Sequence, residues 1–366
     1  MALEDEIGDR RKEIATDAYA MSIGELVNLY KDGELDVHPE FQRVYRWNDE
    51  QKSALVESVL LGIPVPSVFV AQREDGVWDV VDGVQRLSTL LQLQGELKDD
   101  EGNLVPRLVL KGTKFLPSLA HKVWESDDEH SLSSAQRIDI KRAKLDLQII
   151  KRESDSQAKY ELFQRLNSLG SQLTPQEIRN CLLVSINRGR YEWMRALSDY
   201  EPFRLCASLP DNSEDEQYDM ELVLRFLVFR QMSEDRLQSV GNLHQFLTDE
   251  VLTLGADEGY DADRHELAFK TTFDLLASAL ADESFRKYNP TKGRFEGPFL
   301  ISAFELVGMG LGYRAPDLPE DLAVLRKSVE EVWQSAEFSA GFSTGVRADS
   351  RMAKTIPFGR QHFQAI

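Results

Sequence analysis

The chain has 366 residues, a length that predicts about two domains. Its hydrophobic fraction of 42% and charged fraction of 29% are those of a globular protein and exclude an intrinsically disordered one. The 62 acidic residues outnumber the 43 basic residues, so the net charge is −19. Such a surface disfavours non-specific binding to DNA or to an anionic membrane, but it leaves room for a local basic site.

The first half of the chain predicts a mixture of helices and strands. Apolar side chains recur at helical spacing after Asn48 or Asp49, either of which is a suitable N-cap, and Gly62 ends this helix. The elements expected in chain order are a helix over 49–61, strands over 68–71 and 77–81, a helix over about 84–93, a strand over 104–110, a helix over about 135–143 and a strand over 145–150.

From residue 156 the pattern becomes helical, so the whole chain predicts an α+β fold. A polar, acidic stretch over 210–217 is expected to form a loop. The expected helices are 156–168, 175–187, 190–199, 218–232, 243–254, 262–281, 298–311 and 319–337.

The acidic residues are concentrated in this helical half. Between residues 196 and 285 they outnumber basic residues by 20 to 6, whereas over 135–195 basic residues outnumber acidic ones by 12 to 7. The acidic excess predicts a solvated face, with a docking surface or a mimic of nucleic acid as the alternative.

Cysteine content and hydropathy predict a cytoplasmic protein. The only cysteines, Cys181 and Cys206, lie in apolar sequence surroundings, which is typical of a reducing compartment. Residues 1–12 are rich in charge and lack the apolar core of a signal peptide. The longest apolar runs are too short to span a bilayer, so we expect no membrane contact.

Residues 38–47 read His-Pro-Glu-Phe-Gln-Arg-Val-Tyr-Arg-Trp and form the first candidate segment. The guanidinium groups of Arg43 and Arg46 are planar donors suited to phosphate oxygens, and the aromatic rings offer faces for a base. Gln42 adds an amide with both a donor and an acceptor. The alternative interpretation is a surface strand in which Trp47 anchors the following helix.

Residues 80–90 form the second candidate segment, in which a strand runs through Asp82-Gly83 directly into a helix. The first N–H groups of such a helix form a natural anion site, which Gln85 and Arg86 can also reach. Asp82 stands where a carboxylate would hold a divalent cation or a water molecule. The alternative is that Asp82 only caps the helix.

Together these segments resemble the GmrSD-type N-terminal domain family of bacterial restriction and anti-phage proteins. The family's Pro-x-Phe-Gln-Arg-x-x-x-Trp, Ile-Pro-x-Pro and Val-Asp-Gly-Gln-Gln-Arg-Leu segments correspond to residues 39–47, 63–66 and 81–87. A further signature, Phe-x-x-Leu-Asn-(Ser/Thr)-x-Gly-x-x-Leu-(Ser/Thr)-x-x-Glu, corresponds to residues 163–177.

The resemblance implies a ParB/sulfiredoxin-like domain followed by a mainly α-helical one. It divides the chain into an N-terminal extension over 1–20, a ParB-like α/β nucleotide-binding domain over 21–153 and a helical domain over 154–366. It also implies site residues. The catalytic candidates are Asp82, Gln85 and Arg86, with Asp82 also the ligand of Mg²⁺. The candidates for nucleotide and phosphate binding are Gln42, Arg43, Arg46, Gly83, Arg86 and Asn167.

Val84 departs from the family, whose motif has two successive glutamines after the glycine. An apolar side chain cannot contact a phosphate or orient a water molecule. Either Val84 faces the core and only Gln85 and Arg86 act, or hydrolysis is weakened while nucleotide binding survives.

Outside these motifs the interpretations are structural. Thr174 is expected to cap a helix with Glu177 as its capping-box partner, and Asn167 lies in a stretch that also fits a helix C-cap and turn. Arg225 and Arg230 are expected to satisfy core or interface carboxylates, with ligand binding as the alternative. The tail over 347–366 is basic and is expected to be an ordinary terminus, with contact to nucleic acid or to an acidic partner as alternatives.

The function implied is a nucleoside triphosphate-binding sensor or regulator in a restriction or anti-phage system, with hydrolysis in question because of Val84. No HNH-type nuclease motif follows residue 200, so a protein partner is expected to supply the effector activity. One alternative is a module that binds DNA, or reads modified DNA, without turnover. The other is a metal-dependent nuclease that uses Asp82.

Overall fold

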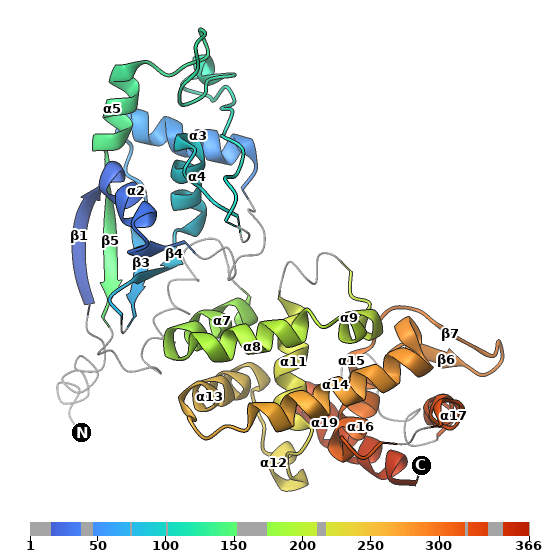
Figure 1. The fold of residues 1–366 in the computed structure, drawn as a ribbon. Coiled ribbons are helices and arrows are strands. Elements are labelled where there is room, and N and C mark those ends of the chain that lie inside the picture. The colour runs from blue at the N-terminus through green and yellow to red at the C-terminus, as the bar shows by residue number, and fades with distance from the viewer. Residues whose placement is uncertain are drawn as a thin grey trace. The chain divides into compact units, whose positions relative to one another are not determined.

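The computed structural model describes residues 16–37, 47–73, 75–99, 102–151, 174–210, 217–318, 321–335 and 347–365. The chain divides into two compact units, Met1–Leu173 and Thr174–Ile366. A mixed sheet with helices forms the first, and helices dominate the second, which confirms the predicted α+β class (Figure 1). The domain boundary expected at residue 153 lies in 152–173, a stretch that the structure does not describe.

A five-stranded sheet in the order β1-β5-β3-β4-β2 forms the centre of the first unit. The outer strand β1 is antiparallel to β5, β5 is parallel to β3, β3 is antiparallel to β4, and β4 is parallel to β2. The strands are β1 (Thr16–Ser22), β2 (Leu35–Asp36), β3 (Val68–Gln72), β4 (Trp78–Asp82) and β5 (Lys144–Ile150). The predicted extension over 1–20 therefore overlaps β1.

Alternating side chains decide which face of this sheet is covered. In β5, Leu145, Leu147 and Ile149 are buried, whereas Lys144 and Asp146 between them are exposed. Successive side chains of a strand point to opposite faces, so the apolar set of β5 packs into one core. Figure 1 shows the helices of this unit beside the sheet. They are α2 (Ile23–Lys31), α3 (Asp49–Leu61), α4 (Val84–Gln94), η2 (Pro117–Leu119) and α5 (Ser134–Arg142).

The capping signals in the sequence have the expected structural effect. The side chain of Asn48 accepts a hydrogen bond from the Gln51 N–H and forms a capping box at the start of α3. Gly62 ends α3 in the left-handed conformation, with φ of 69°.

The strand predicted over 104–110 is wrong. Leu104 forms only an isolated bridge with Lys98, and the residues that follow it belong to no strand. The backbone of Leu110 instead exchanges hydrogen bonds with the irregular segment at His121 and Lys122. The apolar pattern over 104–110 thus belongs to a loop in which Leu108 and Leu110 are buried in the core while Leu104 and Val109 are exposed. Burial of two side chains does not supply a neighbouring strand.

The second unit is built from helices and one small hairpin. Its longer helices are α7 (Pro175–Ile186), α8 (Arg188–Ser198), α11 (Tyr218–Phe229), α13 (Leu243–Ala256), α14 (Ala262–Ala279), α17 (Leu322–Val332) and α19 (Ala348–His362). Its shorter elements are α9 (Glu201–Ala207), α12 (Glu234–Gln238), η3 (Ala281–Glu283), β6 (Lys287–Asn289), β7 (Arg294–Glu296), α15 (Ile301–Ala303), η4 (Phe304–Gly308), α16 (Met309–Arg314) and η5 (Phe363–Ala365).

Most predicted helices of this unit are confirmed, but three details differ. The helix expected over 298–311 is divided by η4, a π-helical turn. The β6–β7 hairpin lies between the helices expected over 262–281 and 298–311, where no strand was predicted. The basic tail, expected to be an ordinary terminus, forms α19 and packs into the unit. The helix predicted over 156–168 and most of the loop predicted over 210–217 fall in 152–173 and 211–216, outside the described residues.

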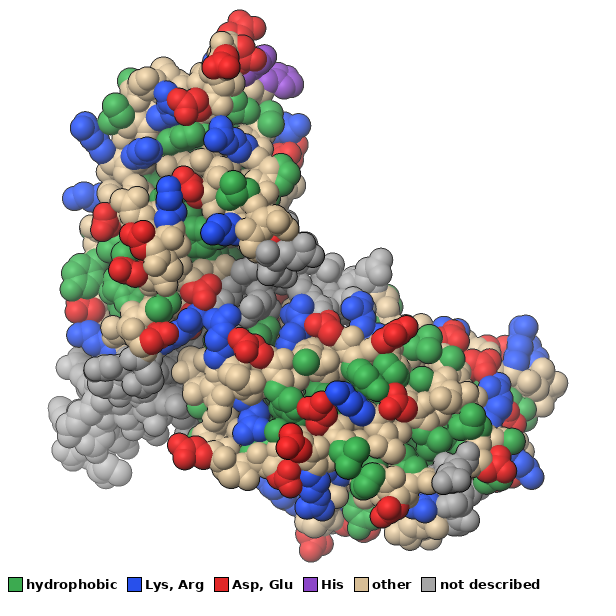
Figure 2. All heavy atoms as spheres, in the orientation of Figure 1, with side chains coloured by type: hydrophobic (Ala, Val, Ile, Leu, Met, Phe, Trp, Pro, Cys, Tyr) green, Lys and Arg blue, Asp and Glu red, His purple; other side chains and the backbone are tan. Residues whose placement is uncertain are grey.

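The surface of the helical unit carries both signs of charge. Figure 2 shows acidic and basic side chains interspersed on the face in view, so the acidic excess is dispersed there. Across the part of the chain that the structure describes, no helix is both long and apolar enough to cross a membrane.

Candidate functional site

The candidate site begins at Gly83, where β4 gives way to α4. Gly83 has φ of 98°, in the left-handed region that residues with a side chain rarely adopt. A Cβ atom at Gly83 would lie 2.9 Å from Cγ2 of Val68 and 3.1 Å from Nη2 of Arg86. Both the backbone conformation and the close packing therefore require glycine at this turn.

Asp82 and Arg86 form an ion pair across the turn. Nη2 of Arg86 donates to Oδ2 of Asp82 at 2.8 Å, and Nη1 donates to the carbonyl oxygens of Pro66 and Ser67 at 2.7 and 3.1 Å. The side chain of Arg86 is 11% exposed and that of Asp82 is 32% exposed. The two motifs at residues 63–66 and 81–87 thus meet through one guanidinium group.

Gln85 connects this turn to the arginine-rich segment. Its side chain is buried, and its Oε1 accepts a hydrogen bond from the backbone N–H of Trp47 at 3.3 Å. Trp47 is the last residue of the segment 38–47, 38 positions earlier in the sequence. The contact brings the described end of the first candidate segment against the first turn of α4.

The start of α4 meets the requirements of an anion site. No side chain caps the helix at Gly83, and the carboxylate of Asp82 is bound to Arg86 rather than to the helix backbone. The interpretation of Asp82 as a simple cap is therefore wrong. Peptide N–H groups at an uncapped helix start are available to a phosphate, and the helix dipole favours negative charge there.

Val84 faces away from this site. Its side chain is 5% exposed and belongs to the hydrophobic core of the first unit. Of the two interpretations of this departure from the family motif, the structure agrees with the one in which Val84 faces the core.

Four predicted site residues are not placed by the structure. Gln42, Arg43 and Arg46 lie in 38–46, and Asn167 lies in 152–173, two ranges outside the described residues. The structure therefore brings together Asp82, Gly83, Gln85 and Arg86, while the arginines expected to bind phosphate stay predictions.

Asp82 is the candidate ligand for Mg²⁺. Within the described ranges, no group of three or more His, Cys, Asp or Glu side chains could hold a metal ion. A single carboxylate nevertheless fits Mg²⁺, because this ion commonly binds one or two carboxylates together with substrate phosphates and water. A single carboxylate suits a metal ion that binds together with a nucleotide better than one that protein side chains hold alone.

A second set of charged residues near the arginine-rich segment was missed by the sequence analysis. Arg73 donates from Nε to Oδ2 of Asp79 at 2.8 Å and from Nη2 to Oδ2 of Asp36 at 2.6 Å. Burial would lower the pKa of Arg73, but the hydrogen bonds and charges of Asp79 and Asp36 raise it above its ordinary value. These ion pairs connect β2 to β4 just before residue 38. Because Arg73 and Asp36 are 37 positions apart in the sequence, no local pattern could have indicated their pairing.

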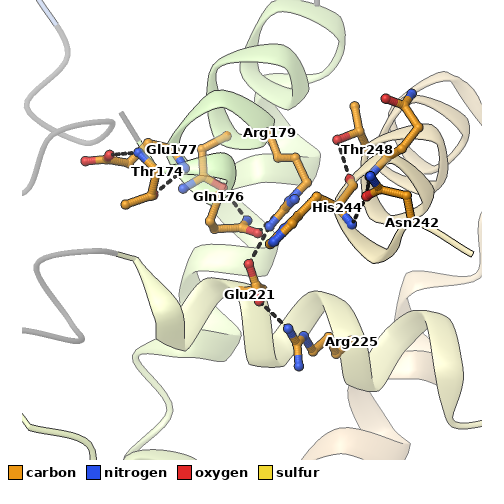
Figure 3. Close-up of polar contacts among 11 residues, drawn as sticks. Thr174, Gln176, Glu177, Arg179, Glu221, Arg225, Asn242, His244 and Thr248 are labelled. Atoms are coloured by element: carbon orange, nitrogen blue, oxygen red, sulfur yellow. Dashed lines mark hydrogen bonds and ion pairs between the residues drawn. The ribbon is translucent and has the colours of Figure 1, made fainter. Parts of the chain in front are cut away.

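The capping box predicted at Thr174 is confirmed and starts α7 (Figure 3). The Thr174 N–H donates to Oε2 of Glu177 at 2.6 Å, and the Glu177 N–H donates to Oγ1 of Thr174 at 3.2 Å. The family signature over 163–177 thus ends on a structurally fixed helix start in the second unit.

A buried ion-pair network follows on the same helix (Figure 3). Nη2 of Arg179 and Nη2 of Arg225 each donate to a different oxygen of Glu221 at 2.5 Å, and Nε of Arg179 donates to Oε1 of Gln176 at 2.8 Å. Burial raises the pKa of Glu221, but Arg225 and Arg179 outweigh this and hold it below its ordinary value.

Of the two arginines expected to satisfy core or interface carboxylates, Arg225 does so and Arg230 does not. Arg230 donates to the carbonyl oxygen of Gly312 and contacts His265. The expectation for Arg230 is therefore wrong, because a carbonyl and a ring nitrogen take the place of the carboxylate.

The comparisons with known proteins agree with the motifs. Residues 23–184 match the model of the GmrSD restriction endonuclease, N-terminal domain, a range that contains the β4–α4 turn and most of α7. No curated protein and no solved structure matches the chain.

Proposed function

Because residues 23–184 form a domain of the GmrSD N-terminal family, we propose that the protein is a nucleotide-binding sensor or regulator of a restriction or anti-phage system. The family supports the broad class, a component of such a system. The uncapped start of α4, beside the Asp82–Arg86 ion pair, is the observation that supports a phosphate ligand.

In this proposal the peptide N–H groups of α4 bind phosphate oxygens at Gly83. Arg43, Arg46 and Gln42 come from the segment that Gln85 contacts through Trp47, and they supply charge and directed amide contacts. Arg86 is held by Asp82 and two carbonyls, so it shapes the turn as well as adding positive charge. Asn167 contacts the nucleotide or the loop that covers it.

Asp82 would hold Mg²⁺ together with the nucleotide phosphates. The ion would neutralise phosphate charge, on which phosphoryl chemistry largely depends. Val84 lies in the core, so any hydrolysis would depend on Gln85, Arg86 and Asp82. Binding is the primary activity proposed, and a protein partner supplies the response.

Calorimetric titration of the full chain with nucleoside triphosphates, with and without Mg²⁺, tests this function. We expect saturable binding that Arg43→Ala weakens by about tenfold or more, as the loss of a charge-assisted phosphate contact predicts. Arg142→Ala is the matched control, because Arg142 is an exposed arginine at the end of α5. Absence of binding by the wild type, or equal affinity in both variants, would overturn the proposal.

Asp82→Asn separates the role of the metal from that of the phosphate. We expect this variant to lose the increase in affinity that Mg²⁺ gives, while binding measured in chelator stays within about threefold of the wild type. Equal Mg²⁺ dependence in both proteins would remove Asp82 from the metal site.

The same preparations distinguish the other functions. DNA binding that persists without nucleotide and falls steeply with salt would instead indicate a DNA-binding module. Plasmid cleavage that is lost in Asp82→Ala would indicate a metal-dependent nuclease. Proteins that copurify with the chain would identify the effector partner.

A further inference from the structure

Arg230, at the end of α11, is a buried cation whose contacts include no carboxylate. The residue is 0% exposed. Its Nη1 donates to the carbonyl oxygen of Gly312 at 3.1 Å, and its Nη2 lies 3.3 Å from Nδ1 of His265. Its Nε is buried without a hydrogen-bond partner. Burial lowers the pKa of Arg230 to about 10, as expected for a cation that lacks a neutralising anion.

Tyr260 belongs to the same cluster and also has an unused donor. Its hydroxyl is buried without a hydrogen-bond partner. Its ring stacks on His265, with ring centroids 4.7 Å apart and planes at 17°. The guanidinium of Arg190 lies 4.5 Å from the Tyr260 ring centroid. Two guanidinium groups and a phenol therefore gather around one imidazole.

Among the charged groups that act on His265, the three arginines Arg190, Arg230 and Arg264 outnumber the one carboxylate, Asp261. Burial and the charges of Arg230 and Arg264 lower the pKa of His265 to about 4, so its ring is neutral at pH 7 and accepts from Arg230. The nearby carboxylates, Asp257 and Asp261, are exposed and accept backbone N–H groups of Gly259 and Arg264. Neither carboxylate contacts Arg230 within the part of the chain that is described.

We propose that Arg230 and Tyr260 form a binding site for an oxyanion of the size of phosphate in the helical unit. Both unused groups, the Nε–H of Arg230 and the hydroxyl of Tyr260, are donors, and the local charge is positive. The missing partner is therefore an anionic acceptor. A water molecule would satisfy the phenol but would not neutralise the guanidinium.

A purely structural role accounts for only part of this arrangement. The bond from Arg230 to Gly312 satisfies a carbonyl in the last turn of α16, and that needs one nitrogen of the guanidinium. This bond does not explain why the Nε atom of Arg230 and the hydroxyl of Tyr260 are buried without hydrogen-bond partners. An anion would complete both, with the guanidinium of Arg190, 4.5 Å from the Tyr260 ring centroid, as a further cationic group nearby.

Thermal unfolding of the full chain in phosphate, compared with chloride at equal ionic strength, tests the site. We expect phosphate to raise the midpoint of wild-type unfolding, and Tyr260→Phe to bind phosphate about tenfold more weakly in calorimetry. Tyr288→Phe is the matched control, because Tyr288 also packs against an aromatic ring, that of Phe295. A wild type that phosphate does not stabilise, or an unchanged phosphate response in Tyr260→Phe, would overturn the proposal.

Two further experiments distinguish this site from the nucleotide site of the first unit. Arg43→Ala should retain the phosphate response that Tyr260→Phe loses, whether or not the chain binds nucleotide. Titration with ATP identifies the source of the anion. If ATP gives a response that depends on Tyr260, the site binds a nucleotide phosphate. If only inorganic phosphate gives a response, the site binds the free anion. Loss of the phosphate response in Arg43→Ala but not in Tyr260→Phe would place the anion in the first unit and refute the site.

Discussion

Gly83 makes the turn between β4 and α4 possible for two separate reasons. Its φ of 98° strains any residue with a side chain, and a Cβ atom there would lie 2.9 Å from Cγ2 of Val68. We expect Gly83→Ala to lower the free energy of unfolding by about 2–3 kcal/mol, measured by urea denaturation. Gly76 has a similar φ of 91° with nothing within 4 Å, so Gly76→Ala isolates the backbone strain. Equal losses in both variants would show that the contact with Val68 costs nothing.

His265 gives the protein a predictable dependence on pH. Its pKa is lowered to about 4 in the folded chain, mainly by burial and then by Arg230 and Arg264, from an ordinary value of 6.5. Between these values the unfolded chain binds a proton that the folded chain does not, so stability falls as the pH drops from 6.5 to 4. The shift corresponds to at most about 3 kcal/mol.

The variant His265→Gln isolates this contribution, because a glutamine oxygen can still accept from Arg230. We expect chemical denaturation to show a smaller loss of stability between pH 6.5 and pH 4 in the variant than in the wild type. His244, whose pKa is also lowered by burial, titrates in both proteins and cancels in the comparison. Parallel stability curves for the two proteins would refute the assignment.

At the residue scale, local spacing decides what could be predicted. Asp82 and Arg86 are four positions apart at a strand–helix turn, so their proximity follows from the sequence. The bond from Trp47 to Gln85 joins residues 38 positions apart, and the bond from Arg73 to Asp36 joins residues 37 apart. Such contacts depend on the order of strands in the sheet, which the pattern of apolar residues does not specify.

At the scale of elements, three arginines connect the ends of three helices in a closed cycle. Arg230 at the end of α11 donates to Gly312 in α16, and Arg314 at the end of α16 donates to the carbonyl of Phe363 after α19. Arg360 near the end of α19 donates to the carbonyls of Phe229 and Arg230 at the end of α11, at 2.8 and 3.1 Å. Each arginine satisfies carbonyls that a helix leaves unpaired, where the helix dipole favours a cation.

Arg360 tests the importance of this cycle. We expect Arg360→Met to lower the free energy of unfolding by about 2–4 kcal/mol, because two buried carbonyls lose a charged donor. The control is Arg347→Met, since the side chain of Arg347 is 80% exposed and pairs with Asp349, and it should cost less than about 0.5 kcal/mol. If both variants lost the same free energy of unfolding in urea denaturation, the cycle would add nothing to stability.

Elements with capping signals were the easiest to predict. The helices α3 and α7 begin at capping boxes and were correctly predicted, whereas the irregular stretch over 104–110 was taken for a strand. The tail helix α19 was missed because its sequence contains Pro357 and the basic residues Arg351, Lys354 and Arg360. Those arginines act inside the fold, since Arg351 binds the buried Glu305 with two nitrogens.

At the scale of the whole molecule, the family match and the compact units divide the chain at different places. The match extends to residue 184, whereas the second unit begins at Thr174, so α7 belongs to both. In the second unit α7 contributes Arg179, which is 0% exposed and bound to Glu221 of α11. The boundary predicted at residue 153 lies just before the pattern turns helical at residue 156, and pattern alone cannot show with which core a helix packs.

Fragments that begin on either side of α7 distinguish the two boundaries. We expect the fragment 174–366 to unfold cooperatively, because it contains both partners of the Arg179–Glu221 pair together with the buried apolar residues Ile178, Leu182 and Leu183. The fragment 185–366 lacks these residues, so Glu221 keeps Arg225 but loses Arg179 as a partner. We expect this to lower the free energy of unfolding by at least about 3–5 kcal/mol. Thermal unfolding followed by circular dichroism should therefore show a sharp transition only for the longer fragment. A shorter fragment of equal stability would place α7 with the first unit and move the boundary of the family domain to residue 184.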